Sequence, residues 1–188
     1  MQQGDKLVGS YDAEQVREGV AVALNGDGTV ALVGGTTWAD GIGAVWVFTQ
    51  SGGNWTQQGN KLVGSDVVGS ANQGGSVALS NNGTVALVGG EGDSDGIGAA
   101  WIFTQSRGNW TQQGNKLVGS DVVGAANFGW AVALSSDGTV AVIGGFSDND
   151  GVGATWVFKQ SGGQWTQQGI KLVGAGAVGD AGQGYPFR

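Results

Sequence analysis

Carboxylates and a tryptophan in three short loops are the residues of this sequence best suited to chemistry. Two loops, EGDSDG and FSDNDG, carry paired aspartates, and the third, TTWADG, carries a tryptophan beside a single aspartate. Paired carboxylates bind cations or, when held about 5–10 Å apart, serve as the acid and base of a glycosidase. A tryptophan face offers a stacking surface for a sugar ring. The candidate ligand-binding residues are Trp38, Asp40, Glu91, Asp93, Asp95, Asp148 and Asp150.

Catalysis and a resident cofactor are both disfavoured by the same residues. The chain has no histidine and no cysteine, which removes His-based triads, thiolate nucleophiles and zinc fingers. The pair Asp93/Asp95 recurs as Asp148/Asp150, and a repeated pair suits structure or binding better than a unique catalytic centre. Calcium needs about six or more oxygen ligands, so two carboxylates per loop fall short. We expect a protein that is not an enzyme, with no cofactor, a weak Ca²⁺ site being the alternative.

Composition narrows the classes of partner. Of 188 residues, 40 are glycine and only one is proline, and the net charge at pH 7 is −7. An acidic chain without clustered Lys and Arg is a poor match for nucleic acid. No apolar run reaches the ~20 residues that cross a bilayer, and the start, MQQGDKLVGS, has no signal-peptide pattern. We expect neither nucleic-acid binding nor membrane insertion.

A 55-residue repeat organises the whole chain. The fifteen residues WTQQGNKLVGSDVVG at 55–69 return unchanged at 110–124. Tryptophans follow the same period without insertion or deletion, at 46, 101 and 156 and at 55, 110 and 165. A large aromatic repeated in every unit is typical of packing between units, so we assign these six to the core rather than to a ligand.

Each unit predicts four strands, at 74–80, 84–90, 98–105 and 110–118 in the second copy. Turn sequences such as NNG and SSDG separate the first two strands and supply the positive φ that tight hairpins require. The first two strands are apolar on both faces, so neighbouring sheets must cover them on both sides. Four antiparallel strands per repeat indicate an all-β fold of β-propeller blades. A β-solenoid is the alternative, although its rungs are usually shorter.

The predicted organisation is a single propeller region over 1–188. It comprises an outer strand at 1–9, blades at 19–64, 74–119 and 129–174, and the start of a further blade at 175–188. Three blades are too few to close a ring, and an exposed sheet face or edge is a liability. We therefore expect either a piece of a longer array or self-association, with a dimer of six blades as the simplest closure.

Three segments carry a family resemblance. FGWAVALSSDGTVAVIGG (128–145), GATWVF (153–158) and QWTQQGIKLVG (164–174) resemble FG-GAP repeat proteins, and in particular their bacterial branch. The resemblance implies a β-propeller, often with seven blades, that is extracellular or at the cell surface and binds proteins or carbohydrates. Integrin α-subunit heads are the best-known relatives.

Departures from the family pattern limit what carries over. Only the third repeat has Phe128-Gly129, and Gly-Ala-Pro is replaced by Gly35-Thr36, Gly90-Glu91 and Gly145-Phe146. Integrin-like relatives hold calcium in the hairpin between the first two strands of a blade. Here that hairpin has at most one carboxylate, so the calcium site is not expected.

Strand direction places most of the fifteen acidic residues at one end of the blades, among the loops that vary between repeats. Variable loops on a constant scaffold are typical of a binding surface, although unconstrained drift gives the same pattern. We expect a non-enzymatic module for protein–protein interaction or assembly through this acidic loop face. The alternatives are a carbohydrate-binding propeller, using Trp38 and the loop aspartates, and a purely structural array.

Overall fold

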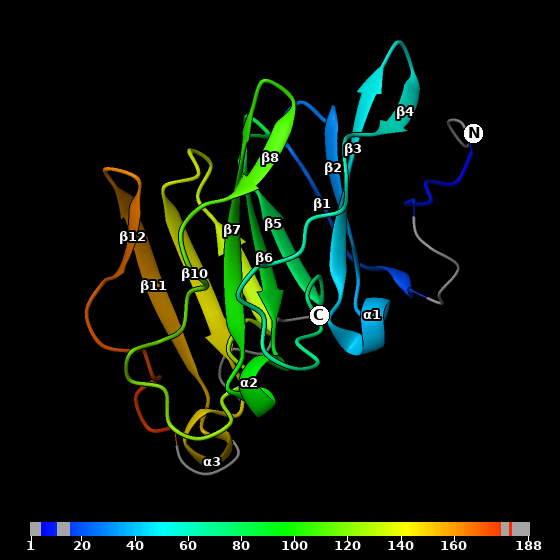
Figure 1. Cartoon of the computed structure of the whole chain (residues 1–188). Coiled ribbons are helices and arrows are strands. Elements are labelled where there is room, and N and C mark those ends of the chain that lie inside the picture. The colour runs from blue at the N-terminus through cyan, green and yellow to red at the C-terminus, as the bar shows by residue number, and fades with distance from the viewer. Residues whose placement is uncertain (1–4, 11–15, 178–180, 182–188) are drawn as a thin grey trace.

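Three four-stranded antiparallel sheets stand side by side in the computed structural model, which describes residues 5–10, 16–177 and 181 (Figure 1). The first contains β1 (Glu18–Leu24), β2 (Val30–Gly35), β3 (Ala44–Ser51) and β4 (Asn54–Gln57). The second contains β5 (Ser76–Leu79), β6 (Val85–Gly90), β7 (Ala99–Ser106) and β8 (Asn109–Gln112). The third contains β9 (Ala131–Leu134), β10 (Val140–Gly145), β11 (Ala154–Ser161) and β12 (Gln164–Gln167). Strands are adjacent in chain order within each sheet, which confirms the predicted propeller blades, called blades 1 to 3 below.

The first strand of each blade is innermost, because β1 contacts β5 and β5 contacts β9. The hairpins after these strands form one end of the molecule, the turn face. The opposite end, the loop face, carries three short helical turns (Figure 1). They are α1 (Trp38–Gly41), α2 (Asp93–Gly96) and α3 (Asp148–Gly151). No helix within the described residues is long and apolar enough to span a membrane.

The core lies between blades rather than within one. Residues of β2 and β3 form a cluster with residues of β6 and β7, and the same arrangement joins blades 2 and 3. Trp46, Trp101 and Trp156 have no exposed surface, as the repeat predicted. Trp101 lies opposite Val88 in the β6–β7 pairing, so the ring is carried by the third strand of the blade. Both faces of the middle strands of blade 2 are apolar because one face contacts blade 1 and the other contacts blade 3.

The glycine pair that ends the second strand allows two backbones to meet. A Cβ atom built on Gly89 would lie 2.0 Å from the carbonyl oxygen of Gly129 in the next blade, and one on Gly34 would lie 2.0 Å from that of Gly74. Only glycine fits such an approach. These residues therefore fix the spacing of the inner strands.

The duplicated fifteen-residue segment forms hydrogen bonds that link neighbouring blades. The Asp66 carboxylate, in the crossover after blade 1, accepts hydrogen bonds from Trp101 Nε1 at 2.8 Å, Gln112 Nε2 at 3.1 Å and the Lys116 amide at 2.7 Å. Asp121 makes the same three bonds to blade 3. Burial alone raises the pKa of the Asp66 carboxyl, but the three donors outweigh it and hold the pKa below its ordinary value. The repeated segment therefore stabilises packing.

Two strand predictions need correction. The fourth strand, predicted over 110–118, ends at Gln112 because Gly114 adopts a positive φ of 72°, and Leu117 then forms an isolated bridge with Ala100. The outer strand predicted over 1–9 is absent from residues 5–9, where the Gly9 amide donates instead to Glu18 Oε1 at 2.8 Å. Residues 1–4, and most of the further blade predicted over 175–188, lie outside the described residues.

Candidate functional site

The three helical turns of the loop face place one exposed carboxylate on each blade. Asp40, Asp95 and Asp150 are 55 residues apart, are exposed, and have φ of 57°, 58° and 56°. Aspartate is among the few residues that tolerate this left-handed conformation. The turn holds each of these carboxylates at the tip of its loop. These three candidates are therefore accessible to a partner.

Asp93 and Asp148, although predicted as ligand-binding residues, are buried. The Asp93 carboxylate accepts a hydrogen bond from the Val68 amide at 2.8 Å and forms an ion pair with the Lys116 ammonium group. Asp148 does the same with the Val123 amide, at 2.7 Å, and with Lys171. A buried carboxylate needs such partners. In this structure the two residues join the loop to the crossover and to the strand-four segment.

Trp38 occupies the equivalent position in blade 1. The Lys61 ammonium nitrogen, equivalent to that of Lys116, lies 4.3 Å from the centre of the Trp38 ring. A cation–π contact therefore replaces the ion pair found in the other two blades. The ring is half-buried and packs on the blade 1 core, so Trp38 is engaged in the same structural role.

A groove of about 580 Å³ lies where the inner strands meet the loop face, and we call it the inner groove. It draws on all three blades, because blade packing brings the starts of β1, β5 and β9 together. Its lining residues are Arg17, Val20, Thr36, Thr37, Asn72, Gly75, Glu91 and Trp130.

Glu91 is the one predicted site residue that lines the inner groove. Its Oε1 accepts a hydrogen bond from Asn72 Nδ2 at 3.2 Å, and its main-chain carbonyl accepts one from Asn127 Nδ2 at 3.3 Å. Burial raises the pKa of the Glu91 carboxyl above its ordinary value, and the hydrogen bonds offset part of that effect. A half-buried carboxylate with a raised pKa gains from a cationic or hydrogen-bond-donating ligand.

Trp130 adds an aromatic surface to the inner groove. The side chain is 36% exposed, and its ring packs edge-on against Phe146, with ring centres 4.8 Å apart. The contact with Phe146 fixes the ring while leaving part of it accessible. Arg17, on the blade 1 side of the groove, is exposed and supplies a positive charge. The groove thus combines an aromatic ring with groups of both charges.

Three groove residues were not predicted as site residues: Trp130, Arg17 and Asn72. The repeat does, however, indicate Trp130. Most groove-lining residues occupy positions where the repeats differ: Val20, Gly75 and Trp130 are equivalent, and Thr36 and Glu91 are equivalent to Phe146. Strand positions such as Trp46, Trp101 and Trp156 are invariant. Comparison of equivalent positions, rather than of loops as a whole, would have identified the groove.

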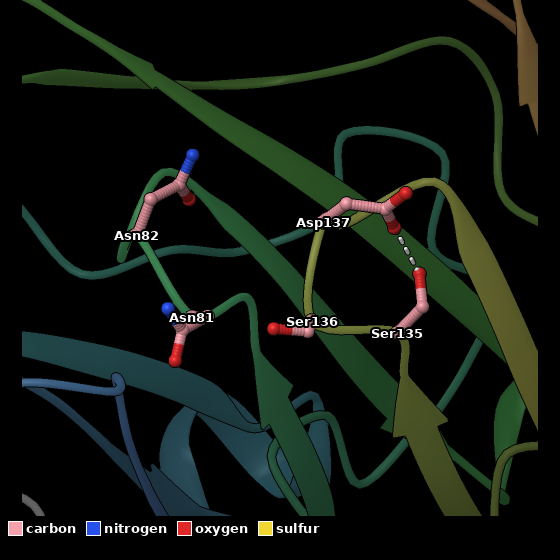
Figure 2. Close-up of a pocket in the computed structure, with 5 residues that line it drawn as sticks. All are labelled: Asn81, Asn82, Ser135, Ser136 and Asp137. Carbon is pink, nitrogen blue, oxygen red and sulfur yellow. Dashed lines mark hydrogen bonds between the residues drawn. The ribbon is translucent and has the colours of Figure 1, made fainter.

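The turn face has a second hollow, of about 590 Å³, between the hairpins of blades 2 and 3 (Figure 2). The side chains of Asn82, Ser135 and Asp137 form hydrogen bonds within their own turns. Asp137 accepts from Ser135 Oγ at 2.5 Å and from the Thr139 amide at 3.0 Å, and Asn82 bonds Ser80 and Thr84 in the same way. The hairpins are also linked directly, because the Asn81 amide donates to the Ser136 carbonyl at 2.9 Å. This hollow lacks an aromatic ring, and its arrangement serves the turns.

Within the described part of the chain, no three acidic side chains come close enough together to hold a metal ion. The exposed aspartates of the loop-face turns, Asp40, Asp95 and Asp150, are one to a blade, and the neighbouring Asp93 and Asp148 are paired with lysines. The described side chains of the loop face offer charge, hydrogen-bond and aromatic contacts.

Comparison with known proteins adds one family match. Residues 110–158 match the model of the FG-GAP repeat. No curated protein matches the chain. Among solved structures, the chain is similar to TolB from Acinetobacter baumannii, with 13% sequence identity and a TM-score of 0.44. The match covers 78% of this chain and 31% of that one, so the chain spans about a third of the length of this relative.

Proposed function

Since this chain contains an FG-GAP repeat and builds propeller blades from it, we propose that it is a non-enzymatic module that binds a protein partner on its loop face. One observation carries the proposal. The inner groove is lined largely where the repeats differ, whereas the buried tryptophans that pack the blades together, Trp46, Trp101 and Trp156, are the same in each repeat. Selection for packing alone gives no reason for an exposed tryptophan at one of three equivalent positions.

The chemistry of the groove describes the partner. The partly exposed ring of Trp130 suits an apolar or planar side chain, and Glu91 and Asn72 suit a donor such as a lysine or arginine. Asp40, Asp95 and Asp150 add exposed negative charge to the same face. Complementary charge speeds association and selects a basic partner over an acidic one. We infer that the partner presents a basic segment with an apolar or aromatic residue.

Carbohydrate is the second candidate, and Trp130 favours it. An aromatic ring beside a carboxylate, an amide and two threonine hydroxyls offers both stacking and hydrogen bonds to a sugar. The predicted role of Trp38 in sugar binding loses support, because that ring already contacts Lys61. We propose that either ligand is met outside the cell or at its surface, as the family resemblance implies.

Parallel peptide and glycan arrays test the proposal. The wild-type chain is compared with Trp130→Ala and Glu91→Gln, and with Asp137→Asn on the turn face as the matched control. We expect a basic peptide to bind, Trp130→Ala to weaken binding about 10-fold or more, and the control to bind like the wild type. Glycans alone as ligands would favour the second candidate. Binding that survives in both groove variants, or is lost in the control, would contradict the proposal.

A further inference from the structure

Two matching hollows lie on the outer rim of the blades, and we call them the rim pockets. The first, of about 240 Å³, lies at the junction of blades 1 and 2, and residues 58–62 and 108–110 line it. The second, of about 230 Å³, lies at the junction of blades 2 and 3, and residues 113–117 and 163–165 line it. The two linings are equivalent and differ only where Asn109 is replaced by Gln164. The chain thus builds one kind of pocket twice.

A half-buried tryptophan lines each rim pocket. Trp110 packs on the cluster that joins blades 1 and 2, and Trp165 packs on the one that joins blades 2 and 3. The Trp110 Nε1 atom donates a hydrogen bond to Gln58 Oε1 at 3.1 Å, and Trp165 Nε1 donates to Gln113 Oε1 at 3.2 Å. These contacts across the junction fix each ring beside its pocket. A ring that is already fixed offers a stacking surface to a ligand at little entropic cost.

Exposed amide side chains complete the lining. They are Asn60 and Asn109 in the first pocket and Asn115 and Gln164 in the second. Within the described part of the chain, none of these four amide groups forms a hydrogen bond with another residue. An amide has two donor hydrogens and an acceptor oxygen, so both pockets keep unused hydrogen-bonding capacity.

Backbone geometry does not account for these amides. Asparagine is common in tight turns because it tolerates a left-handed backbone, but here glycine takes that conformation, with φ of 68° at Gly59 and 85° at Gly108. Ile170 stands where the other repeats have Asn60 and Asn115, so the fold accepts an apolar residue at this position. The amides therefore indicate a ligand rather than a requirement of the turn.

Charge contributes little inside the rim pockets. Lys61 and Lys116 line them, but the Lys61 ammonium nitrogen lies 4.3 Å from the centre of the Trp38 ring, and that of Lys116 is paired with Asp93. Among the described residues, no carboxylate lines either pocket. Both volumes lie below the about 300–1,000 Å³ of sites for drug-sized ligands, so each pocket suits one small ring. An aromatic ring beside uncharged amides suits a ligand with many hydroxyl groups and no charge.

We propose that each rim pocket binds one sugar unit of a neutral saccharide. The sugar ring stacks on Trp110 or Trp165, and its hydroxyl groups exchange hydrogen bonds with the unused amides of the same pocket. The proposal is independent of the partner proposed for the loop face, because the rim pockets share no residue with the inner groove. One ligand is expected at each of the two junctions.

Two-dimensional ¹H–¹⁵N NMR of the 188-residue chain tests the proposal. The probes are neutral oligosaccharides of glucose, mannose, galactose and N-acetylglucosamine. The indole N–H signals of Trp110 and Trp165 report on the rim pockets, and that of Trp130 reports on the inner groove. We expect at least one probe, at up to about 10 mM, to shift both rim signals.

Paired variants make each pocket the control for the other. Asn60→Ala with Asn109→Ala should weaken binding at the first pocket about 10-fold or more and leave the second pocket unchanged. Asn115→Ala with Gln164→Ala should do the reverse. Asn81→Ala, which removes an exposed amide on the turn face, is the matched control and should bind as the wild type does.

The spectrum of each variant also shows whether its blades remain folded. A panel in which no saccharide shifts the Trp110 and Trp165 signals together would overturn the proposal. So would binding that both paired variants retain, or binding that is lost in Asn81→Ala. A probe that shifts the Trp130 signal alone would overturn it too, and would support the saccharide candidate for the inner groove.

Discussion

Asp66→Asn should weaken the hydrogen bonds that link the crossover after blade 1 to blade 2. In the folded chain the carboxylate accepts bonds from Trp101 Nε1, Gln112 Nε2 and the Lys116 amide, at 2.8, 3.1 and 2.7 Å. An asparagine keeps one oxygen and turns an NH₂ group toward one of these donors. Each bond to a charged acceptor contributes about 1.5–3 kcal/mol, and partial exposure of the site reduces this. We expect a loss of about 2–4 kcal/mol in the free energy of unfolding.

The dependence on pH separates this effect from a change in packing. The pKa of Asp66 is lowered on folding from an ordinary value of 3.8, so its contribution is present above that value. It is lost as the pH falls through the lower pKa of the folded state. The difference between the wild type and Asp66→Asn should therefore be full at pH 7 and shrink below about pH 3.8.

Urea unfolding followed by tryptophan fluorescence measures both quantities. Asp95→Asn, an exposed loop carboxylate, is the matched control and should change stability by no more than about 0.5 kcal/mol. A loss below about 0.5 kcal/mol in Asp66→Asn, or a loss that is the same at pH 7 and pH 3, would refute the reasoning.

Three further substitutions test other contacts, each by urea unfolding. Glu91→Gln should stabilise the fold by up to about 1 kcal/mol at pH 7 and by less at pH 4. Burial raises the pKa of Glu91 and so penalises its charged form, which is populated at pH 7. Equal effects at the two pH values would contradict this. Gln73→Phe should change stability by no more than about 1 kcal/mol. It removes the buried Gln73 Nε2, which has no partner among the described residues, but also the Oε1 that accepts from the Gly64 amide at 2.7 Å, and Phe128 fills the equivalent position. A loss above about 2 kcal/mol would argue against this balance. Asp93→Asn should lower the free energy of unfolding by about 2–4 kcal/mol, because it breaks a buried ion pair. Lys61→Ala should lower it by under about 1 kcal/mol, because it removes only a cation–π contact. A larger loss in Lys61→Ala than in Asp93→Asn would be inconsistent with the structure.

The 55-residue period was sufficient to predict the blades, because strand, turn and tryptophan positions recur without a shift. It did not predict which loop carboxylates face solvent. Asp93 and Asp95 look alike in the sequence, yet the partner of Asp93 is Lys116, 23 residues away in the segment that follows the fourth strand. That contact depends on how the fourth-strand segment bends after Gln112.

The inner groove could not be predicted from the sequence of any single loop. Arg17, Asn72 and Trp130 are far apart in the sequence and meet only because the inner strands pack side by side. The close approach of Gly34 to Gly74, and of Gly89 to Gly129, sets the spacing that brings them together. The sequence pattern within one repeat predicts each blade, but the groove forms only when the three blades pack together.

The location of a bound ligand tests the central claim most directly. Hydrogen–deuterium exchange by mass spectrometry, with and without the strongest array ligand, shows which backbone segments that ligand protects. Our account predicts protection on the loop face, at residues 36–41, 70–75, 91–97 and 127–130. Protection confined to the turn face, at residues 25–29, 80–84 and 135–139, would contradict it.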